Sequence, residues 1–521
     1  MRRLFALGAI AVGGLIYASE ATSRPAPPPI LDEVPPAAQS SHDAWLDYRN
    51  PTALEGWADA WFDRFPPDPE GTVLIDRRHG YLQADDIHLG LHTTSYSYMH
   101  TYGRAMDLLR SAGVHLEQHR DLLTPGALSG RSGVFINLPA GRAPAFERSE
   151  VLTLEAFVRH GGALVLIVDH TNAYLHADVL SGMAQVFGFR LPPVTNADRG
   201  PGRTLSPSSV AWVRIRPLQD HPVTDGVQVG GILTGGVIEG LDGVMGTSEN
   251  GWQDAWNPDS DSSGFTGDLK RQPDEPRGGG AAVAVKQHGE GRLVLLGDQN
   301  AFGATMLGYE DNARIWTNAW MWALGRDVEV DEGDRVSFLA GPRSMCSSVA
   351  PLGFHTFYVQ AARLGEWSGR RETCTAGAPR GAHVVMLPEF EGPIPNPERG
   401  VALLAPDAAS MRLLDELGLT WSTTEPVEGR LRWDLPDPLA LGLVGPVSVA
   451  PVKLDQDLEV VAWDAADRPL VVRHGGWLLV LDGRMVGGGS IGRESAARSQ
   501  NPGAHDAALR LLGWLFTPPS H

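Results

Sequence analysis

The feature that most constrains the fold of this chain is an internal repeat. Residues 289–325 read as an apolar strand, a glycine-containing gap and an amphipathic helix, and residues 475–516 read the same way. A repeated strand-loop-helix unit fixes the architecture before any single motif does, and it indicates two copies of one α/β unit. The second copy keeps the apolar pattern but changes the polar residues. We therefore expect any functional site to lie in the first copy.

Short apolar runs alternate with helix-like segments along the first copy. The runs that predict strands are 72–76, 114–117, 133–138, 163–169 and 292–297. The segments that predict helices are 99–109, 150–160, 178–187 and 311–324. This alternation predicts an α/β domain with a parallel sheet and helices on both faces. Residues 211–286 are rich in Gly, Asp and Val, break the rhythm and predict a β-rich excursion at the sheet edge.

The second copy follows in the same order, after a polar segment at 326–334. Its predicted strands and helices are 336–340, 355–364, 383–387, 401–405 and 408–417. A chain of 521 residues is long enough for two or three hydrophobic cores. The expected divisions are an N-terminal segment at 1–21, a Pro/Ala-rich tether with a short helical segment at 22–70, and domains at 71–326 and 335–517.

The N-terminus has the pattern of an export signal. Two arginines precede the apolar run Leu4–Ala18, and small residues follow it. The run is shorter than the roughly 20 residues that span a bilayer, which favours a cleaved signal peptide over a permanent anchor. Either alternative predicts an exported protein that is periplasmic, secreted or held at the membrane by its N-terminus.

Charge and cysteine content narrow the class of partner and the compartment. The net charge is −19, which argues against nucleic acid or an anionic membrane as the main partner, because both need basic patches. Cys346 and Cys374 are the two cysteines of the chain. In an exported protein they could form a disulfide, whereas in a reducing compartment they would be two buried thiols. The signal-like N-terminus favours the disulfide.

Three stretches of the first copy carry a resemblance to a known family. They are Asp76-Arg-Arg-His79-Gly80, the run from Gly162 through Asp169-His170 to Asn172, and the run from Gly291 to Asp298. They resemble class I glutamine-amidotransferase-like domains that have lost the amidotransferase chemistry, found in bacterial membrane-associated proteins. The resemblance implies two tandem flavodoxin-like parallel-sheet domains, the second degenerate. It implies no activity, because one fold serves many functions.

Glutamine amidotransferase activity itself is not expected. That reaction needs a cysteine nucleophile on a sharp turn between a strand and a helix, with a histidine and an acid behind it. Residues 71–326 contain no cysteine, and the turn after the strand at 163–169 carries Asp169 and His170 instead.

Polar side chains cluster where the predicted strands of the first copy end. Ligands in a parallel α/β sheet bind beyond the carboxyl ends of the strands. The candidate ligand-binding residues at those ends are Asp76, His79, Asp169, His170, Asp298 and Asn300. Two Asp and two His could hold a divalent cation such as Zn, Mn or Fe, or could act as acid and base. The alternative is that these groups cap helices and pin loops.

Three further patterns have a functional and a structural interpretation. The histidine-rich stretch from His79 to His100 is either a lid over the site or a solvated loop. Trp252, Trp256 and Phe265 either stack on sugar rings or are buried against the sheet. Residues 488–492 fit a G-x-S-x-G pattern, but a glycine loop intervenes between strand and serine, so we interpret the match as chance.

The sequence therefore favours a non-catalytic, envelope-associated binding or scaffold protein. Its expected partner is an envelope protein or a small ligand, and no cofactor is firmly indicated. The alternative is a hydrolase, with or without a divalent metal, that acts on a carbohydrate or an amide through the Asp/His residues of the first domain. Convergence of those residues in one pocket would favour the enzyme, and dispersal would favour the binding protein.

Overall fold

The computed structural model describes residues 51–80, 101–327 and 335–516, with internal gaps. The gaps are 142, 201, 207–208, 257–266, 304–305, 342–345, 347–353, 355–356, 359, 362–363, 365–370, 376–378, 380, 424–426, 430–431, 434–446, 450–451, 464–466 and 487–501. The predicted signal, most of the tether and of the linker, the histidine-rich stretch beyond residue 80, Phe265 and the G-x-S-x-G match at 488–492 lie outside the described residues. The same is true of half of the helix predicted at 355–364.

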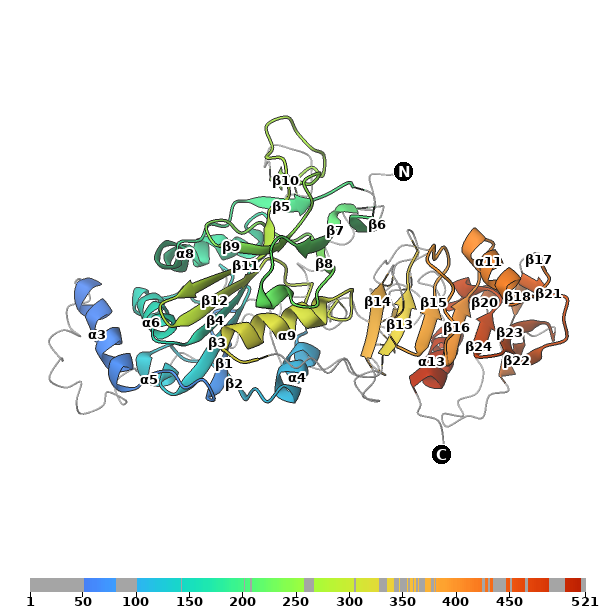
Figure 1. The fold of residues 1–521 in the computed structure, drawn as a ribbon, viewed down its shortest axis with the longest axis horizontal. Helices are drawn as coiled ribbons and strands as arrows, with labels where there is room; N and C mark the ends of the chain where they lie inside the picture. The colour runs from blue at the N-terminus through green and yellow to red at the C-terminus, as the bar shows by residue number, and fades with distance from the viewer. Residues whose placement is uncertain are drawn as a thin grey trace.

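The first domain is built on one large mixed sheet with strand order β2-β1-β3-β4-β12-β11-β9-β7-β6, and β8 pairs with β7 (Figure 1). Its strands are β1 (Thr72–Asp76), β2 (Leu116–His119), β3 (Arg131–Asn137), β4 (Ala163–Ile167), β6 (Thr204–Ser206), β7 (Ser209–Pro217), β8 (Gly230–Leu233), β9 (Asp242–Gly246), β11 (Ala281–His288) and β12 (Gly291–Leu296). The strands from β2 to β12 run parallel, and the following ones are antiparallel.

Helices cover both faces of this sheet, because its central strands are apolar on both sides. The helices are α3 (Pro51–Arg64), α4 (Gly103–Ser111), α5 (Pro125–Leu128), α6 (Arg148–Arg159), α7 (His176–Val179), α8 (Ser181–Phe187) and α9 (Asn312–Ala323), with short 3-10 turns η4 (Ala173–Leu175) and η5 (Pro222–Thr224). One face packs against α4 and α9, where Trp316 and Trp320 are fully buried. The other packs against α6 and α8, and α3 lies outside α6.

The β-rich excursion predicted at 211–286 lies at the sheet edge, as expected, but most of it belongs to the main sheet. β11, β9 and β7 continue the sheet beyond β12 as antiparallel strands. The separate part is a two-stranded ribbon of β5 (Val194–Ala197) and β10 (Trp252–Ala255), which projects at the top of Figure 1. The excursion therefore lengthens the sheet and adds a small ribbon over its edge.

The second domain has a sheet with the order β14-β13-β15-β16-β24-β23-β22-β19. Its elements are β13 (Arg335–Leu339), β14 (Arg371–Thr375), β15 (His383–Met386), β16 (Arg399–Leu403), α11 (Ala408–Glu416), β17 (Trp421–Thr423), β18 (Val427–Gly429), β19 (Arg432–Trp433), β20 (Val447–Val449), β21 (Val452–Leu454), β22 (Glu459–Trp463), β23 (Pro469–His474), β24 (Trp477–Val480), η6 (Gly483–Val486) and α13 (Pro502–Phe516). Five parallel strands are followed by antiparallel ones, as in the first domain. The predicted α/β class, with large sheets that contain parallel strands, is confirmed.

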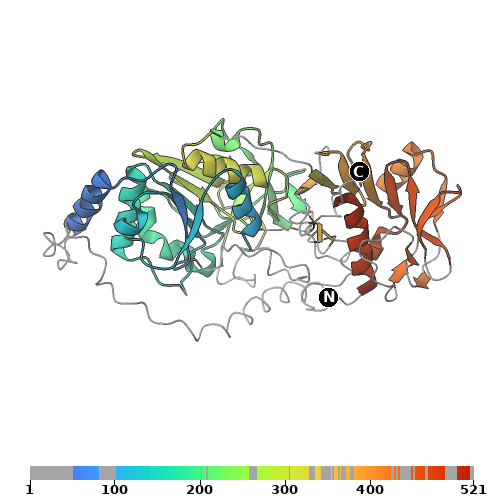
Figure 2. The same ribbon diagram turned by 90° about the horizontal axis from the view of Figure 1, so that it is seen from below.

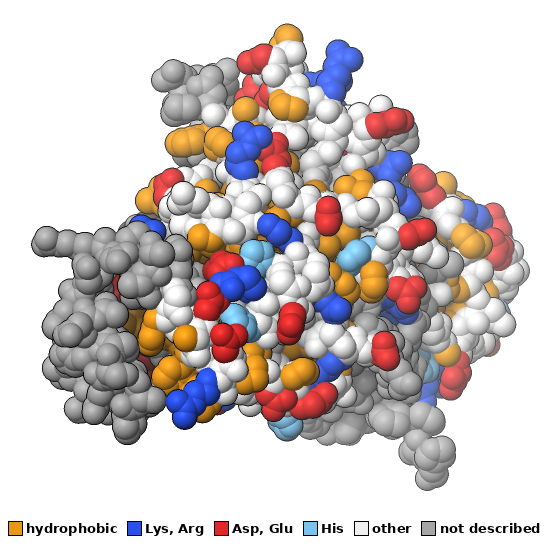
Figure 3. Space-filling model, turned by 60° about the vertical axis from the view of Figure 1, so that its left-hand side comes forward, with side chains coloured by type: hydrophobic (Ala, Val, Ile, Leu, Met, Phe, Trp, Pro, Cys, Tyr) orange, Lys and Arg blue, Asp and Glu red, His pale blue; other side chains and the backbone are white. Residues whose placement is uncertain are grey.

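The two sheets lie side by side along the long axis of the molecule (Figure 2). Among the described residues, no helix is long and apolar enough to cross a membrane. Acidic and basic side chains are interspersed on the face drawn in Figure 3, and no broad area of Lys and Arg is visible there.

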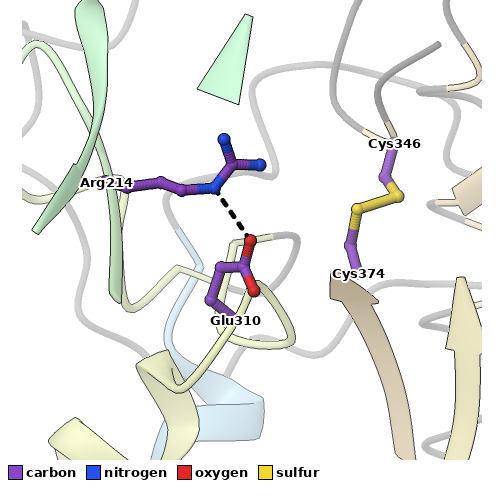
Figure 4. Close-up of a disulfide and its surroundings, with 4 residues drawn as sticks. All are labelled: Arg214, Glu310, Cys346 and Cys374. Atoms are coloured by element: carbon purple, nitrogen blue, oxygen red, sulfur yellow. Dashed lines mark hydrogen bonds and ion pairs between the residues drawn. A yellow bond between two sulfur atoms is a disulfide. The ribbon is translucent and has the colours of Figure 1, made fainter. Parts of the chain in front are cut away.

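The domains are joined at the outer edge of β14. The backbone N–H of Glu310 donates to the carbonyl of Cys374 at 2.9 Å, and the N–H of Cys374 donates to the carbonyl of Gly308 at 2.9 Å. Cys374 is bonded to Cys346, 28 residues earlier in the chain, and Arg214 pairs with Glu310 at 3.0 Å beside this disulfide (Figure 4). Tyr309 belongs to a core cluster made mostly of second-domain residues. The loop that precedes α9 therefore forms an isolated β-bridge between Tyr309 and Cys374, beside the edge strand β14.

Candidate functional site

The predicted site residues lie on two different faces of the first sheet. Side chains alternate between faces along a strand. Ile75 packs with α4 and α9 whereas Leu74 packs with α6, so Asp76, two residues after Leu74, points toward α6. By the same alternation Asp169 and Asp298 follow Ile167 and Leu296 toward α4 and α9. The six residues therefore form no single cluster.

On the α6 face, Asp76 and His79 form a buried ionic network with Glu150. His79 Nδ1 lies 2.9 Å from Asp76 Oδ2, and His79 Nε2 lies 3.4 Å from Glu150 Oε2. The ring of His79 also stacks on Phe146, with centroids 3.8 Å apart. Burial lowers the pKa of His79, but the two carboxylates outweigh burial and raise the pKa to about 9. His79 is therefore a cation at neutral pH, held between two anions.

Glu150 connects this network to the start of α6. Its carboxylate accepts hydrogen bonds from the backbone N–H of Leu123 at 3.0 Å and of Glu147 at 2.9 Å. Burial raises the pKa of Glu150, but His79 and these backbone donors lower it below its ordinary value. Both carboxylate oxygens of Glu150 are thus engaged within the protein. A group held in this way stabilises the fold and is poorly suited to exchange protons with a substrate.

On the α4/α9 face, Asp169 and Asp298 form a buried pair of carboxyl groups, each less than 5% exposed. Burial raises the pKa of Asp298 to about 7 despite hydrogen bonds from the backbone N–H groups of Leu233 at 2.6 Å and Asn300 at 2.7 Å. Burial and the nearby Asp298 charge raise the pKa of Asp169 well above its ordinary range. The hydroxyl of Tyr102 lies close by and donates to the Gln299 carbonyl at 2.6 Å.

A short loop after β4 begins at Asp169 and is braced by a second histidine. His176 is fully buried, its Nδ1 lies 2.8 Å from the carbonyl of Ala173, and its Nε2 accepts the N–H of Asp169 at 3.3 Å. Burial lowers the pKa of His176 to about 4, so the ring is neutral at physiological pH and can keep both bonds. His170 lies at the start of the same loop, where its Nδ1 is 2.7 Å from the hydroxyl oxygen of Thr171.

The braced loop presents two apolar side chains to solvent on a strained backbone. Tyr174 is 39% exposed and Leu175 is 54% exposed. Both have left-handed backbone conformations, with φ of 59° and 64°, and so have Thr171 and Asn172, with φ of 43° and 55°. For a residue other than glycine this conformation costs of order 1–3 kcal/mol, and it persists only where the surroundings enforce it. We call Tyr174 and Leu175 the apolar tip.

Hydrogen bonds enforce that conformation. Asn172 accepts the N–H of Ala177 at 2.9 Å on its side-chain oxygen and donates from its side-chain nitrogen to Asp178 at 3.0 Å. The N–H of Gly141 donates to the carbonyl of Tyr174 at 2.9 Å. A β-carbon on Gly141 would lie 2.8 Å from Leu175 Cδ1, so glycine allows the close approach. The tip is therefore held in one place before any partner arrives.

The structure separates the site residues that the sequence grouped together. Asp169, Asp298 and Asn300 are neighbours, His170 borders them, and Asp76 with His79 lies across the sheet. Among the described residues, no group of three His, Cys, Asp or Glu side chains is arranged to hold a metal ion. The predicted Asp/His metal set is therefore not assembled. Sequence reasoning missed Glu150 and His176, because the partners of both side chains come together only in the folded domain.

The sequence left two interpretations for the aromatic residues of the ribbon, stacking on sugar rings and burial against the sheet. The two described tryptophans differ in this respect. Trp252 is 1% exposed and lies under the guanidinium of Arg199, so it belongs to the interior. Trp256 is 39% exposed. Of these two tryptophans, Trp256 therefore keeps an aromatic face accessible to a ligand, and Trp252 does not.

Comparison with known proteins yields weak likenesses only. No protein-family model matches the chain, and no curated protein matches it. Among solved structures, the mmIFT52 N-terminal domain is 13% identical, covers 50% of this chain and 100% of its own, and has a TM-score of 0.35. A putative ThuA-like protein from Parabacteroides merdae is 11% identical, covers 51% of this chain and 94% of its own, and has a TM-score of 0.28.

An exo-beta-1,4-mannosidase from Opitutaceae bacterium strain TAV5 is 14% identical over 49% of this chain and 36% of its own, with a TM-score of 0.25. At these values the similarities carry no inference about ligand, activity or partner.

Proposed function

We propose that this protein is a non-catalytic, envelope-associated binding or scaffold protein built from two tandem flavodoxin-like domains of the amidotransferase-like type. The shared order of the strands in the two sheets supports the tandem arrangement, since 2-1-3-4-5 is an order of doubly wound flavodoxin-like sheets. The signal-like N-terminus and the disulfide support export. The partner is an envelope protein that contacts the apolar tip.

One observation carries the non-catalytic assignment: the candidate catalytic residues are engaged in internal bonds. His79 is held between Asp76 and Glu150, and His170 Nδ1 lies 2.7 Å from the hydroxyl oxygen of Thr171. A general acid or base must reach a substrate proton within hydrogen-bond distance. The position of Asp76 and His79 on the face opposite Asp169 and Asp298 gives less support to the alternative, a hydrolase that uses the whole Asp/His set.

The apolar tip is the surface that we assign to the partner. Rigid presentation lowers the entropy lost on binding, and strain concentrates where function demands an unusual backbone. Two side chains cover only the centre of a stable interface, which buries roughly 800 Å² on each partner. A tyrosine flanked by leucine suits the anchor of such an interface, since binding energy concentrates in a few central, often aromatic, residues.

The test is recovery of the partner from a native envelope fraction by crosslinking, with wild type and a Tyr174→Ser/Leu175→Ser variant compared. We expect the variant to fold normally and to bind the recovered partner roughly 10-fold or more weakly, as loss of a hot spot does. Leu218→Ser is the matched control, because Leu218 is 49% exposed and lies away from the tip. Equal weakening by both variants, or by neither, would contradict the assignment.

A further inference from the structure

The buried carboxyl pair lies within a wider set of oxygen atoms, which we call the acid–amide cluster. It consists of Asp169, Asp298, Gln299 and Asn300. The Gln299 side chain lies against the Asp169 carboxyl, and Asn300 Nδ2 donates to the carbonyl of Leu233, whose own N–H donates to Asp298. The ends of β4, β8 and β12 thus meet at these four residues.

Several oxygens of this cluster have no hydrogen-bond donor. Gln299 Oε1 and Asn300 Oδ1 are buried without a partner, and Gln299 is 96% buried. Asn137, at the end of the adjacent strand β3 and on the same face, is 1% exposed, and neither atom of its amide has a partner. A buried acceptor without a donor costs about 1–3 kcal/mol. Several such acceptors beside two carboxyls indicate a site built for a positive charge.

No Lys or Arg of the described residues pairs with either carboxyl, and His170 Nε2 lies 3.8 Å from Asp169 Oδ1. Carboxylate and amide oxygens without imidazole or thiolate are the donors that hard divalent cations prefer. The cluster shares Asp169, Asp298 and Asn300 with the candidates that the sequence predicted, but it contains Gln299 and no histidine.

We propose that the acid–amide cluster binds a hard divalent cation of the Mg²⁺ or Ca²⁺ type. Two carboxylates balance its charge, and the amide oxygens of Gln299 and Asn300 complete the protein ligands, with Asn137 within the same layer of the sheet. The cation ties together the ends of β4, β8 and β12 beneath the loop that carries the apolar tip. This role is separate from partner binding.

The test uses the full chain after removal of metals with a chelator. Tb³⁺ replaces either cation, and Tyr102, hydrogen-bonded to the Gln299 carbonyl, lies close enough to sensitise its luminescence. We expect saturable luminescence with one Tb³⁺ per chain. Displacement by Ca²⁺ or by Mg²⁺ then identifies which ion the site prefers, and metal analysis of the untreated protein should find the same ion.

Two variants connect the signal to the cluster. Asp298→Asn should weaken Tb³⁺ binding by roughly 10-fold or more, since it removes a ligand charge. Asp254→Asn is the matched control, because Asp254 is also fully buried, and this variant should bind as wild type does. If Asp298→Asn does not fold, Gln299→Met removes a neutral ligand and should weaken binding too. Absence of a saturable signal in wild type, or unchanged affinity in the cluster variants, would overturn the proposal.

Discussion

Removal of the disulfide should destabilise the second domain and loosen its contact with the first. Cys346 and Cys374 are separated by 28 residues, and a link across such a loop reduces the entropy of the unfolded chain by about 12 cal/mol/K. At 25 °C this corresponds to about 3.6 kcal/mol. For a domain of this size, the loss should lower the midpoint of thermal unfolding by roughly 7–14 °C.

The position of Cys374 adds a second consequence. Its backbone makes the two hydrogen bonds to Gly308 and Glu310 that join the domains. Greater mobility of Cys374 should therefore weaken this joint directly. Arg214 and Glu310 both lie on the first-domain side of the same joint, so their ion pair should persist when the joint opens. We therefore expect faster amide hydrogen exchange at Glu310 and Cys374 when the link is absent.

The assay is calorimetric unfolding of wild type, of Cys346→Ser/Cys374→Ser, and of wild type treated with a reductant. The treated protein and the variant should lose the same stability, and the transition of the first domain should shift less than that of the second. Leu218→Ser serves as a control for a surface change outside the joint. A shift below about 2 °C, or unchanged exchange at Glu310, would refute the reasoning.

Three further predictions follow from the first domain. The raised pKa of His79, about 9, corresponds to a contribution of about 3 kcal/mol to the free energy of unfolding. This contribution is complete below pH 6.5, the ordinary pKa of histidine, and is lost as pH rises through about 9. Urea unfolding at several pH values checks this, and His79→Gln should remove the pH dependence. Because the pKa of His176 is lowered to about 4, acidification below pH 6.5 should favour local opening of the loop, seen as faster hydrogen exchange at residues 170–176 and absent in His176→Asn. A β-carbon at Gly236 would lie 2.3 Å from the Asp169 carbonyl, so Gly236→Ala should lower the unfolding temperature, whereas Gly513→Ala, with open space around it, should not.

Much of the fold could be predicted from the sequence, because strand and helix patterns alternate strongly. The strand predicted at 72–76 coincides with β1, and the helix predicted at 311–324 contains α9. The antiparallel continuation through β11 and β9 was missed as part of the main sheet. β9 is short and contains two glycines, and β11 begins as an apolar run without alternation, so only their pairing shows that they extend the sheet.

The predicted site failed because of the geometry of buried strands. β1 and β4 are apolar on both sides, so the sequence offers no alternation from which to read the face toward which Asp76 or Asp169 points. Neighbouring side chains along a strand point to opposite faces, so an error of one residue in the expected position of a strand reverses the predicted face of every side chain. The alternative that such residues serve as caps holds in the second domain, where Asp407 accepts the N–H groups of Ala409 and Ser410.

The apolar tip could not be anticipated either. Thr171 and Tyr174 adopt left-handed conformations without any glycine in the loop, and only the surrounding hydrogen bonds enforce them. The brace by His176 depends on two backbone groups that come together only in the folded loop. Tertiary contacts of this kind leave no local sequence signal.

The assignment of the tip as the partner surface is tested most directly by hydroxyl-radical footprinting. Oxidation of Tyr174 would be compared between the purified protein and the protein in its native envelope fraction. Trp256 is the internal reference, because both side chains are 39% exposed. The account predicts that the envelope partner protects Tyr174 several-fold relative to Trp256. Equal oxidation of Tyr174 in both preparations would contradict a partner at the tip.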